Sequence, residues 1–384
     1  MVLFLHNRYR TTGGEERVVE DLMWLVREHL HEPAELLARD SADLSRTGAA
    51  AGLLRGGLDP DEVTRVVRLT GARVVHAHNL QPALGWRALA AARGAGARVV
   101  LHLHQYRLVC AIGVCFTRGQ ECTRCHGRNT LPGVQLNCRG SRPEAAAYGA
   151  SLALWQRRLV EHADAIVVPS DFALGRLREL GAPIPWERTH VLPSPLPALD
   201  AHTPPPSPLP ADGYALIVSR LSPEKGIAVA IEACRIAGLR LVVAGEGPER
   251  AALTALAART GEPEVRFVGA VDDAELTRLR AGASIALAPS RSAETFGVAV
   301  AEAMAAGLPV AASAVGALPE LLGEEALVAP GDPAPLAEAI GRLAGDRKAG
   351  EENRRRISTL CAPSALASKL AAIYGARVAA SGST

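Results

Sequence analysis

The sequence predicts an α/β fold with two domains, each built on a parallel sheet. The chain contains 384 residues, and because single domains usually hold about 100 to 200 residues, two are expected. Short apolar runs alternate with helical segments along most of the chain, which is typical of parallel sheets covered by helices on both faces. The expected buried strands are residues 2–6, 74–78, 99–104, 165–168, 215–218, 239–244 and 284–288.

A proline cluster interrupts the alternating pattern. Eight prolines lie between residues 192 and 212, and because proline lacks the backbone donor that helices and central strands need, a stiff connector is expected there. Residues 108–142 lack periodicity and carry five of the seven cysteines, which indicates an insertion in the first domain. The predicted organisation is a first domain over 1–195, a linker over 196–212, a second domain over 213–350 and C-terminal helices over 351–384.

The composition excludes several classes of protein. Apolar residues make up 48% and charged residues 21%, as in an ordinary folded protein. The net charge is only +2, so no global preference for nucleic acid or an anionic membrane is expected. The N-terminal apolar run is too short for a signal peptide, and no run is suited to span a membrane. With seven cysteines and no export signal, a reducing, cytoplasmic location is expected.

Two glycines follow the first expected strand. His6 ends that strand, and Gly13 and Gly14 lie where helical spacing begins. Glycines at a strand-to-helix turn let the backbone approach a ligand, and the free amides at a helix start favour a phosphate. An ordinary tight turn explains the same pair equally well. The pair is therefore a phosphate-binding candidate only in combination with other motifs.

The second domain repeats this arrangement with positive charges. Arg220 and Lys225 follow the expected strand over residues 215–218, at the sheet edge where open α/β proteins bind ligands. Only three of the 42 cationic residues are lysines, so a lysine at this position stands out. Two cations beside a helix start suit a diphosphate, and solvated loop charges are the alternative.

Two glutamates flank a further helix start. Glu294 lies in the loop before Gly297, and Glu302 lies within the helix that follows. The amides of Phe296, Gly297 and Val298 are then available to a phosphate. Because carboxylates bind vicinal hydroxyls such as those of ribose, the segment is predicted to bind a polyhydroxylated, phosphorylated ligand. For Glu302, an exposed helix position is the alternative.

These residues together resemble the retaining nucleotide-sugar glycosyltransferases of family four. In the second domain the resemblance rests on Arg220 with Lys225, Gly245-Glu-Gly-Pro248, Phe267-Val-Gly269 and the Glu-x-Phe-Gly-x4-Glu-Ala-Met-Ala segment of Glu294 and Glu302. In the first domain it rests on Leu5-His-Asn-Arg-Tyr-Arg, Gly13-Gly-Glu-Glu and Val100-Leu-His-Leu-His-Gln-Tyr-Arg-Leu-Val-Cys110. The resemblance covers nearly the whole chain. It implies the GT-B fold, with two Rossmann-like domains facing across a cleft and the last helix packing on the first domain.

The resemblance also implies roles for individual residues. It places Arg220 and Lys225 on the donor diphosphate, Glu294 on the donor sugar and Glu302 on the ribose. Gly13 and Gly14 match its phosphate-facing loop. His104 matches a histidine near the donor sugar and the reaction centre, a role for which His76, His78 and His102 compete. The expected catalytic residues are therefore His104, Glu294, Arg220 and Lys225.

The implied reaction is a retaining sugar transfer without a catalytic metal. The resemblance implies a nucleoside-diphosphate sugar donor, of UDP or GDP type, and a hydroxyl acceptor on a glycan, a lipid-linked group or a small molecule. No nucleic-acid partner is expected, and peripheral membrane contact and oligomeric state stay open. The alternatives are a GT-B nucleotide-sugar epimerase or phosphorylase, and a zinc-containing nucleic-acid-binding protein on an inactive scaffold.

The cysteines of the insertion form a metal-type pattern. Cys122 and Cys125 have the spacing of a metal knuckle, and Cys110 and Cys138 flank them at similar distances along the chain. Four thiolates can close a tetrahedral zinc shell and would order a segment that lacks apolar periodicity. Free buried thiols or a redox pair are the alternatives. Whether Cys115 or His126 joins the site stays open.

Overall fold

The structure is a computed structural model that describes residues 1–9, 13–200 and 213–375. It forms two compact units. The first comprises residues 1–117, 122–197 and the segment from 363 onward, and the second comprises residues 118–121 and 198–362. Most of the proline-rich linker expected over 196–212 lies outside the described residues.

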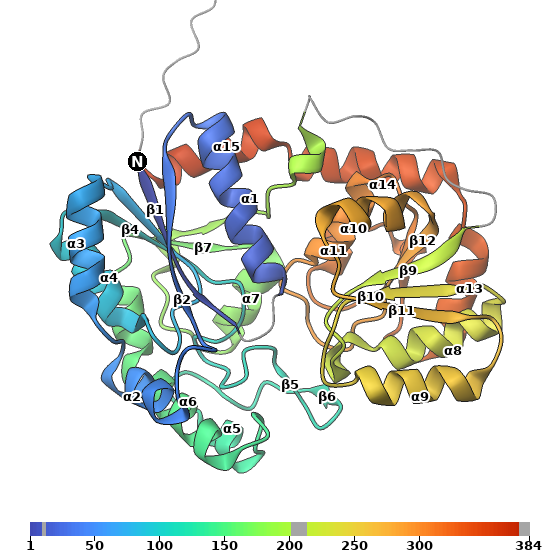
Figure 1. Cartoon of the computed structure of the whole chain (residues 1–384), viewed down its shortest axis with the longest axis horizontal. Coiled ribbons are helices and arrows are strands. Elements are labelled where there is room, and N and C mark those ends of the chain that lie inside the picture. Colours follow the sequence, from blue (N-terminus) through green and yellow to red (C-terminus); the bar gives the residue numbers. More distant parts are fainter. Residues whose placement is uncertain (10–12, 201–212, 376–384) are drawn as a thin grey trace, which may run out of the picture. The chain divides into compact units, whose positions relative to one another are not determined.

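The first unit is built on a six-stranded parallel sheet with strand order β2-β1-β3-β4-β7-β8. Helices α1 and α15 lie on one side of this sheet, and α3 and α4 lie on the other (Figure 1). The strands are β1 (Val2–Arg8), β2 (Ala34–Asp40), β3 (Val74–Ala77), β4 (Arg98–His102), β7 (Ala165–Val168) and β8 (Thr189–Val191). The α-helices are α1 (Gly14–His29), α2 (Arg46–Arg55), α3 (Pro60–Thr70), α4 (Gly85–Gly94), α5 (Leu131–Gln135), α6 (Arg142–Glu161), α7 (Asp171–Glu179) and α15 (Pro363–Ile373).

Short elements complete the description of this part of the chain. Between β4 and α6 the chain forms a small two-stranded sheet of β5 (Phe116–Thr117) and β6 (Gln120–Glu121), followed by α5. Short 3-10 turns are η1 (Trp186–Arg188) and η2 (Pro197–Leu199).

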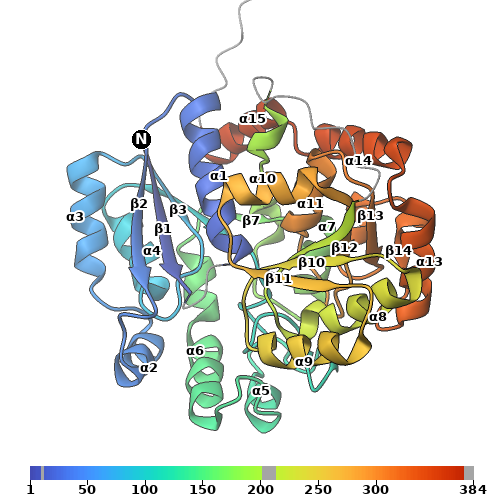
Figure 2. The same ribbon diagram turned by 45° about the vertical axis from the view of Figure 1, so that its right-hand side comes forward.

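The second unit is built on another six-stranded parallel sheet, with order β11-β10-β9-β12-β13-β14. Helices α8 and α9 lie on one side of it, and α10 and α11 lie on the other (Figure 2). The strands are β9 (Tyr214–Val218), β10 (Leu241–Ala244), β11 (Val265–Gly269), β12 (Ala283–Ala288), β13 (Val310–Ser313) and β14 (Leu327–Val328). The helices are η3 (Pro223–Lys225), α8 (Ile227–Ala237), α9 (Arg250–Thr260), α10 (Asp273–Ala281), α11 (Val298–Ala305), α12 (Leu318–Leu321), η4 (Glu324–Ala326), α13 (Pro333–Leu343) and α14 (Arg347–Leu360).

The two parallel sheets confirm the α/β prediction. The sequence pattern missed one central strand of these sheets, β13, and all four of their edge strands. The missed strands β2 and β8 form the edges of the first sheet, and β11 and β14 form the edges of the second. Each is largely half-buried rather than buried on both faces. An edge strand therefore lacks the continuous apolar run that marks a central parallel strand.

Parallel register aligns polar residues near the carboxyl ends of the first three central strands. Phe4 on β1 lies opposite His76 on β3, and His76 lies opposite Val100 on β4. Side chains two residues apart on a strand point to the same face. The residues that follow, His78 after β3 and His102 at the end of β4, are therefore brought to one region of the sheet.

The C-terminal helices differ from the expectation that residues 351–384 act together on the first domain. Helix α14 belongs to the second unit, where Asn353 donates from Nδ2 to the carbonyl of Leu308 at 3.0 Å. Helix α15 belongs to the first unit, where Arg98 Nε donates to the carbonyl of Ile373 at 3.0 Å. Pro363, the first residue of α15, separates the two helices because proline cannot continue a helix. Among the described helices, none is long and apolar enough to cross a membrane.

Candidate functional site

The loop after β9 carries the two predicted diphosphate-binding cations. It contains the short turn η3, which ends at Lys225, and Gly226 then starts α8 with a φ of 66°. A Cβ at Gly226 would lie 2.0 Å from the carbonyl oxygen of Pro289 in the loop after β12. Only glycine permits this approach without displacing the backbone. The loops after β9 and β12 are therefore held against each other at the carboxyl edge of the second sheet.

Lys225 forms an ion pair with Glu294 across these two loops. The distance from Nζ to Oε1 is 2.7 Å, and the two side chains are 27% and 18% exposed. The Ser290 hydroxyl donates to the same carboxylate oxygen at 2.6 Å. Burial raises the pKa of Glu294, but Lys225 and Ser290 more than offset burial and hold the pKa below its usual value. The carboxylate is therefore ionised at neutral pH and remains partly accessible.

Arg220 is held by a second carboxylate that the sequence analysis missed. Its Nη2 lies 2.6 Å from Glu224 Oε1, and Ser222 donates to the same oxygen at 2.6 Å. Burial raises the pKa of Glu224, while Ser222 and Arg220 lower it to a net value below the usual one. Glu224 is 9% exposed, whereas Arg220 is 46% exposed. The buried glutamate therefore positions a guanidinium that still has surface for a ligand.

The predicted helix start at Gly297 is present. Gly297 precedes α11 with a φ of 97°, and a Cβ there would lie 2.6 Å from Leu318 Cδ2. Phe296 is buried, and Gly297 and Val298 are half-buried. Amides at the start of an α-helix lack partners within the helix, so this end suits an anionic group.

Glu302 is paired within the second unit. Arg280 on α10 places Nη2 2.5 Å from Glu302 Oε2, and the two side chains are 15% and 14% exposed. The sequence analysis missed Arg280, because no local pattern links two residues on different helices. Any hydroxyl that binds Glu302 must share this carboxylate with Arg280.

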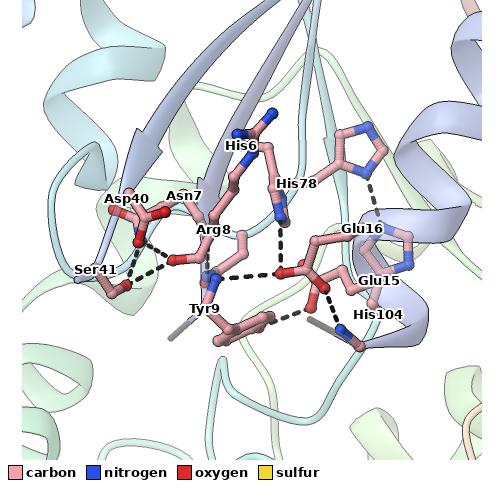
Figure 3. Close-up of polar contacts among 12 residues, drawn as sticks. His6, Asn7, Arg8, Tyr9, Glu15, Glu16, Asp40, Ser41, His78 and His104 are labelled. Carbon is pink, nitrogen blue, oxygen red and sulfur yellow. Dashed lines mark hydrogen bonds and ion pairs between the residues drawn. The ribbon is translucent and has the colours of Figure 1, made fainter. Parts of the chain in front are cut away.

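In the predicted phosphate loop of the first unit, two backbone amides already bond to a side chain of helix α1. The amide of Gly13 donates to Glu16 Oε2 at 2.9 Å, and the amide of Tyr9 donates to Glu16 Oε1 at 3.1 Å (Figure 3). Gly13 has an extended φ of −142°. A Cβ on Gly14 would meet no described atom within 4 Å. Packing within the described chain therefore does not require glycine at position 14, and the amide of Gly13 already has a partner.

His104 lies in a group of histidines. Its Nε2 is 2.7 Å from His78 Nδ1 (Figure 3), and its ring stacks on His102 with centroids 4.0 Å apart. Burial, together with the nearby His6, lowers the pKa of His104 to about 3. A neutral imidazole has one donor and one acceptor nitrogen, so His104 has the chemistry to bind a sugar hydroxyl rather than to carry a charge at pH 7.

A further polar cluster joins the loop before α1 to the segment after β4. The Tyr9 hydroxyl donates to Glu15 Oε2 at 2.7 Å, and Arg107 Nη1 donates to Tyr9 at 3.0 Å. Arg107 also donates to Gln105 Oε1 at 3.0 Å. Burial raises the pKa of Glu15. The tyrosine and arginine were visible in the resemblance, but their pairing depends on β1 and β4 lying on either side of β3 in one sheet.

Five cysteines line one small cavity in the segment over residues 108–142. They are Cys110, Cys115, Cys122, Cys125 and Cys138. The side chain of Cys115, with the backbone amides of Ile112 and Gly113 also contributing, lowers the pKa of Cys110 to about 6. Burial raises the pKa of Cys125. The donor set thus suits zinc in kind, and one thiol has thiolate character.

The cysteine cavity does not form a closed metal shell. Across the described residues, no three cysteine sulfurs lie within 4.8 Å of one another. Cys115, which the sequence pattern left outside the proposed four, is fully buried and contacts Cys110. His126 is not among the residues that line the cavity.

Comparisons with known proteins agree with this architecture. Residues 9–195 match the family described as "Glycosyl transferase 4-like domain", and residues 213–346 match "Glycosyl transferases group 1". The chain belongs to the GT-B glycosyltransferases. The family and the GT-B fold predicted from the sequence are thereby confirmed.

Relatives of this GT-B glycosyltransferase include named enzymes. The chain is 38% identical over 121 residues to the MMP alpha-(1->4)-mannosyltransferase of Mycolicibacterium hassiacum. That match covers 29% of this chain and 29% of the relative, so the matched part spans less than a third of the relative's length.

Solved structures share the fold over nearly the whole chain. HepE from Anabaena in complex with UDP is 18% identical, with a TM-score of 0.63 and coverage of 97% of this chain and 99% of that one. Sucrose-phosphate synthase from Thermosynechococcus elongatus is 19% identical, with a TM-score of 0.69 and coverage of 98% of both chains. At these identities the likeness establishes the fold.

Proposed function

We propose that this protein is a retaining glycosyltransferase that transfers a sugar from a nucleoside-diphosphate sugar to a hydroxyl acceptor. The observation that carries the proposal is the Lys225–Glu294 pair, which joins a cation and a carboxylate beside the start of α11. A diphosphate needs positive charge and free amides, and a sugar needs a hydrogen-bond acceptor for its hydroxyls. The complex of HepE with UDP supports a nucleotide-type donor.

Arg220 and Lys225 are the proposed ligands of the donor diphosphate. The guanidinium offers a planar pair of donors and the ammonium offers a compact charge. The amides of Phe296, Gly297 and Val298 contribute the helix start. Binding of a diphosphate to Lys225 would draw the ammonium partly away from Glu294, which frees this carboxylate for the sugar hydroxyls.

Glu302 and His104 have separate proposed roles. Glu302 would accept from the ribose hydroxyls while Arg280 fixes its orientation. His104 would accept or donate one hydrogen bond near the donor sugar as a neutral imidazole. Gly13 and Gly14 remain phosphate-loop candidates, with Gly14 the more open of the two.

Retention follows from attack on the face that the diphosphate leaves. The acceptor oxygen forms a bond to the anomeric carbon as the bond to the diphosphate oxygen breaks, and that leaving oxygen takes the acceptor proton. Arg220, Lys225 and the α11 amides stabilise the charge that develops on the diphosphate. No side chain serves as a nucleophile, and no catalytic metal is required because cations and amides face the phosphates.

The test is a panel of UDP and GDP sugars with and without candidate acceptors. We expect one donor to raise the melting temperature, since a ligand bound only by the native state stabilises it. Nucleoside diphosphate should then appear only when an acceptor hydroxyl is present, and proton NMR should show a retained anomeric configuration. An epimerase would change the donor sugar without an acceptor, a phosphorylase would require phosphate, and an inverted product would refute retention.

Structural zinc in the cysteine cavity is a separate part of the proposal. Cys110, Cys122, Cys125 and Cys138 would supply the thiolates, and closing the shell requires the sulfurs to move closer than they lie in this structure. All seven cysteines are free of disulfides, which supports a reducing, cytoplasmic compartment. Zinc analysis of the purified protein, with Cys125→Ser against Cys234→Ser as the control, tests this assignment. Absence of zinc with every thiol reactive in the native state would refute it.

A further inference from the structure

Three buried histidines of the first unit converge on one point. His76, His78 and His102 each offer a ring nitrogen, and these three nitrogens all lie within 4.8 Å of one another. Their relative exposures are 0%, 3% and 3%. They come from β3 and β4, adjacent central strands whose parallel register places the side chains on one face.

Each of the three rings has at least one nitrogen without a hydrogen-bond partner among the residues that the structure describes. These nitrogens are His76 Nε2, His78 Nε2 and both ring nitrogens of His102. Buried polar atoms without a partner are rare in native structures, so four such ring nitrogens in one cluster need an explanation. Neutral imidazole is the form that binds a metal ion.

The opposite nitrogens of two rings already have hydrogen-bond partners. His76 Nδ1 lies 2.8 Å from the hydroxyl of Tyr374, and His78 Nδ1 lies 2.7 Å from His104 Nε2. In metal sites the ring nitrogen that does not bind the ion is normally held by a hydrogen bond, which fixes the tautomer. With Nδ1 engaged, each ring has Nε2 available as the ligand atom.

Negative charge lies beside His6 and His104, two histidines whose rings neighbour His78. Glu16 Oε1 lies 3.5 Å from His6 Nε2, and the charge of Glu16 also acts on His104. Glu15, in the same turn of α1, interacts electrostatically with His6. A buried divalent ion is stabilised by nearby carboxylates.

We infer that His76, His78 and His102 form a binding site for a divalent transition-metal ion, with zinc the best match. Three imidazoles suit zinc, which takes Zn–N distances of about 2.0 to 2.1 Å, so that tetrahedral nitrogens lie about 3.3 Å apart. The planes of His76 and His102 are 9° apart, and the ring of His78 is tilted by about 30° to both. Binding therefore turns the rings and draws the nitrogens together by up to about 1.5 Å. Tyr374 and His104 act as positioning residues.

The site would couple the metal ion to His104, the residue proposed to lie near the donor sugar. A metal on His78 Nε2 requires the proton on Nδ1, which then donates to His104 Nε2. His104 must carry its own proton on Nδ1. The metal thus sets the tautomer of His104 without touching substrate.

Cobalt titration of the chelator-treated full-length protein tests the inference. We expect cobalt to produce ligand-field absorption that persists in Cys122→Ser/Cys125→Ser and is lost in His102→Ala. His190→Ala, a strand histidine outside the group, is the matched control and should bind as the parent does. Tyr374→Phe should weaken binding about tenfold by releasing His76. This site lies in the first unit only, so its failure would leave the proposed transfer reaction untouched.

A measurement on the parent protein removes dependence on variant folding. Two-bond proton–nitrogen NMR of the histidine rings should show the Nε2 signals of His76 and His78 shift on addition of zinc while their Nδ1 atoms stay protonated. Absorption with thiolate-to-cobalt charge transfer alone, unchanged binding in a folded His102→Ala, or histidine signals that do not respond to zinc would each overturn the site.

Discussion

The two sheets present chemically different residues at the same structural position. At the carboxyl edge of the second sheet, each of two cations is held by a carboxylate, Lys225 by Glu294 and Arg220 by Glu224. At the carboxyl edge of the first sheet, His76, His78 and His102 are buried with unpartnered nitrogens among the described residues. Both edges arise from the same parallel architecture, in which loops after the strands carry the functional groups.

The difference shows how the polar side chains at each edge are stabilised when they are buried. Ion pairs keep charge at the second edge before any ligand arrives, and the carboxylates stay ionised because their neighbours offset burial. The three histidines at the first edge stay neutral, since burial lowers their pKa values. The second edge is therefore prepared for an anion, and the first for neutral hydrogen bonding or a metal ion.

Acidification should produce the largest effect. It should lower the free energy of unfolding through the buried histidines at the carboxyl edge of the first sheet. The pKa of His76 is about 3 when folded and about 6.5 when unfolded, so between these values the unfolded state binds more protons. The free energy of unfolding should then fall as pH falls below about 6.5, by about 2 kcal/mol at pH 5 from His76 alone. The pKa values of His78 and His102 are shifted in the same direction.

Urea unfolding of chelator-treated protein at pH 7.5 and pH 5 measures this effect. His76→Leu should show a smaller pH dependence than the parent, and His29→Leu should not. Equal pH dependence in the parent and in a folded His76→Leu would show that the first edge is not held neutral by burial.

Removal of the cation from the second edge should give the next largest effect. Lys225→Ala should weaken nucleoside-diphosphate binding by about 1.5 to 3 kcal/mol, the scale of a charge-assisted hydrogen bond. Calorimetric titration with UDP and GDP measures the loss, with the exposed Lys348→Ala as control. Binding of the nucleoside without phosphates should change little. Unchanged diphosphate affinity would contradict the role of Lys225.

The ion pair between Arg280 and Glu302 in the second unit should contribute to stability. Arg280→Ala should lower the free energy of unfolding by about 2 kcal/mol, because it removes the guanidinium that is paired with the largely buried Glu302 carboxylate. Arg278 on the same helix forms a pair with Glu275 in which it is 73% exposed. Arg278→Ala should therefore cost less than about 0.5 kcal/mol. Similar losses in both variants, measured by urea unfolding, would show that burial does not distinguish the pairs.

The smallest effect should come from glycines at two helix starts, Gly297 before α11 and Gly14 at the first position of α1. Gly297→Ala should destabilise the protein by about 1 to 2 kcal/mol, because alanine at a φ of 97° is strained and its Cβ approaches Leu318. Gly14→Ala should leave stability unchanged or slightly higher, since the Cβ has space and alanine favours helices. Thermal unfolding of both variants compares them, and a larger loss in Gly14→Ala would reverse the assignment.

The sequence by itself determined the central strands and the residues that follow them. Continuous apolar runs identified seven of the eight central strands, because such strands are buried on both faces. Chain order alone then placed Arg220, Lys225 and Glu294 after strands, where parallel sheets gather their loops. Gly297, which precedes α11, was also predicted from the local sequence, because few other residues suit a strand-to-helix turn.

Only the tertiary structure decided which of these residues act together. Lys225 pairs with Glu294, 69 positions away, because β9 and β12 are neighbours in the sheet. Arg220 pairs with Glu224, only four residues later in the chain. Edge strands escaped prediction because half-burial leaves no continuous apolar run. The histidine group depends on the register between β3 and β4 and on Tyr374, almost 300 residues away in the chain. A sequence records which side chains exist, but burial, and with it their pKa values and partners, follows from the packing of distant elements.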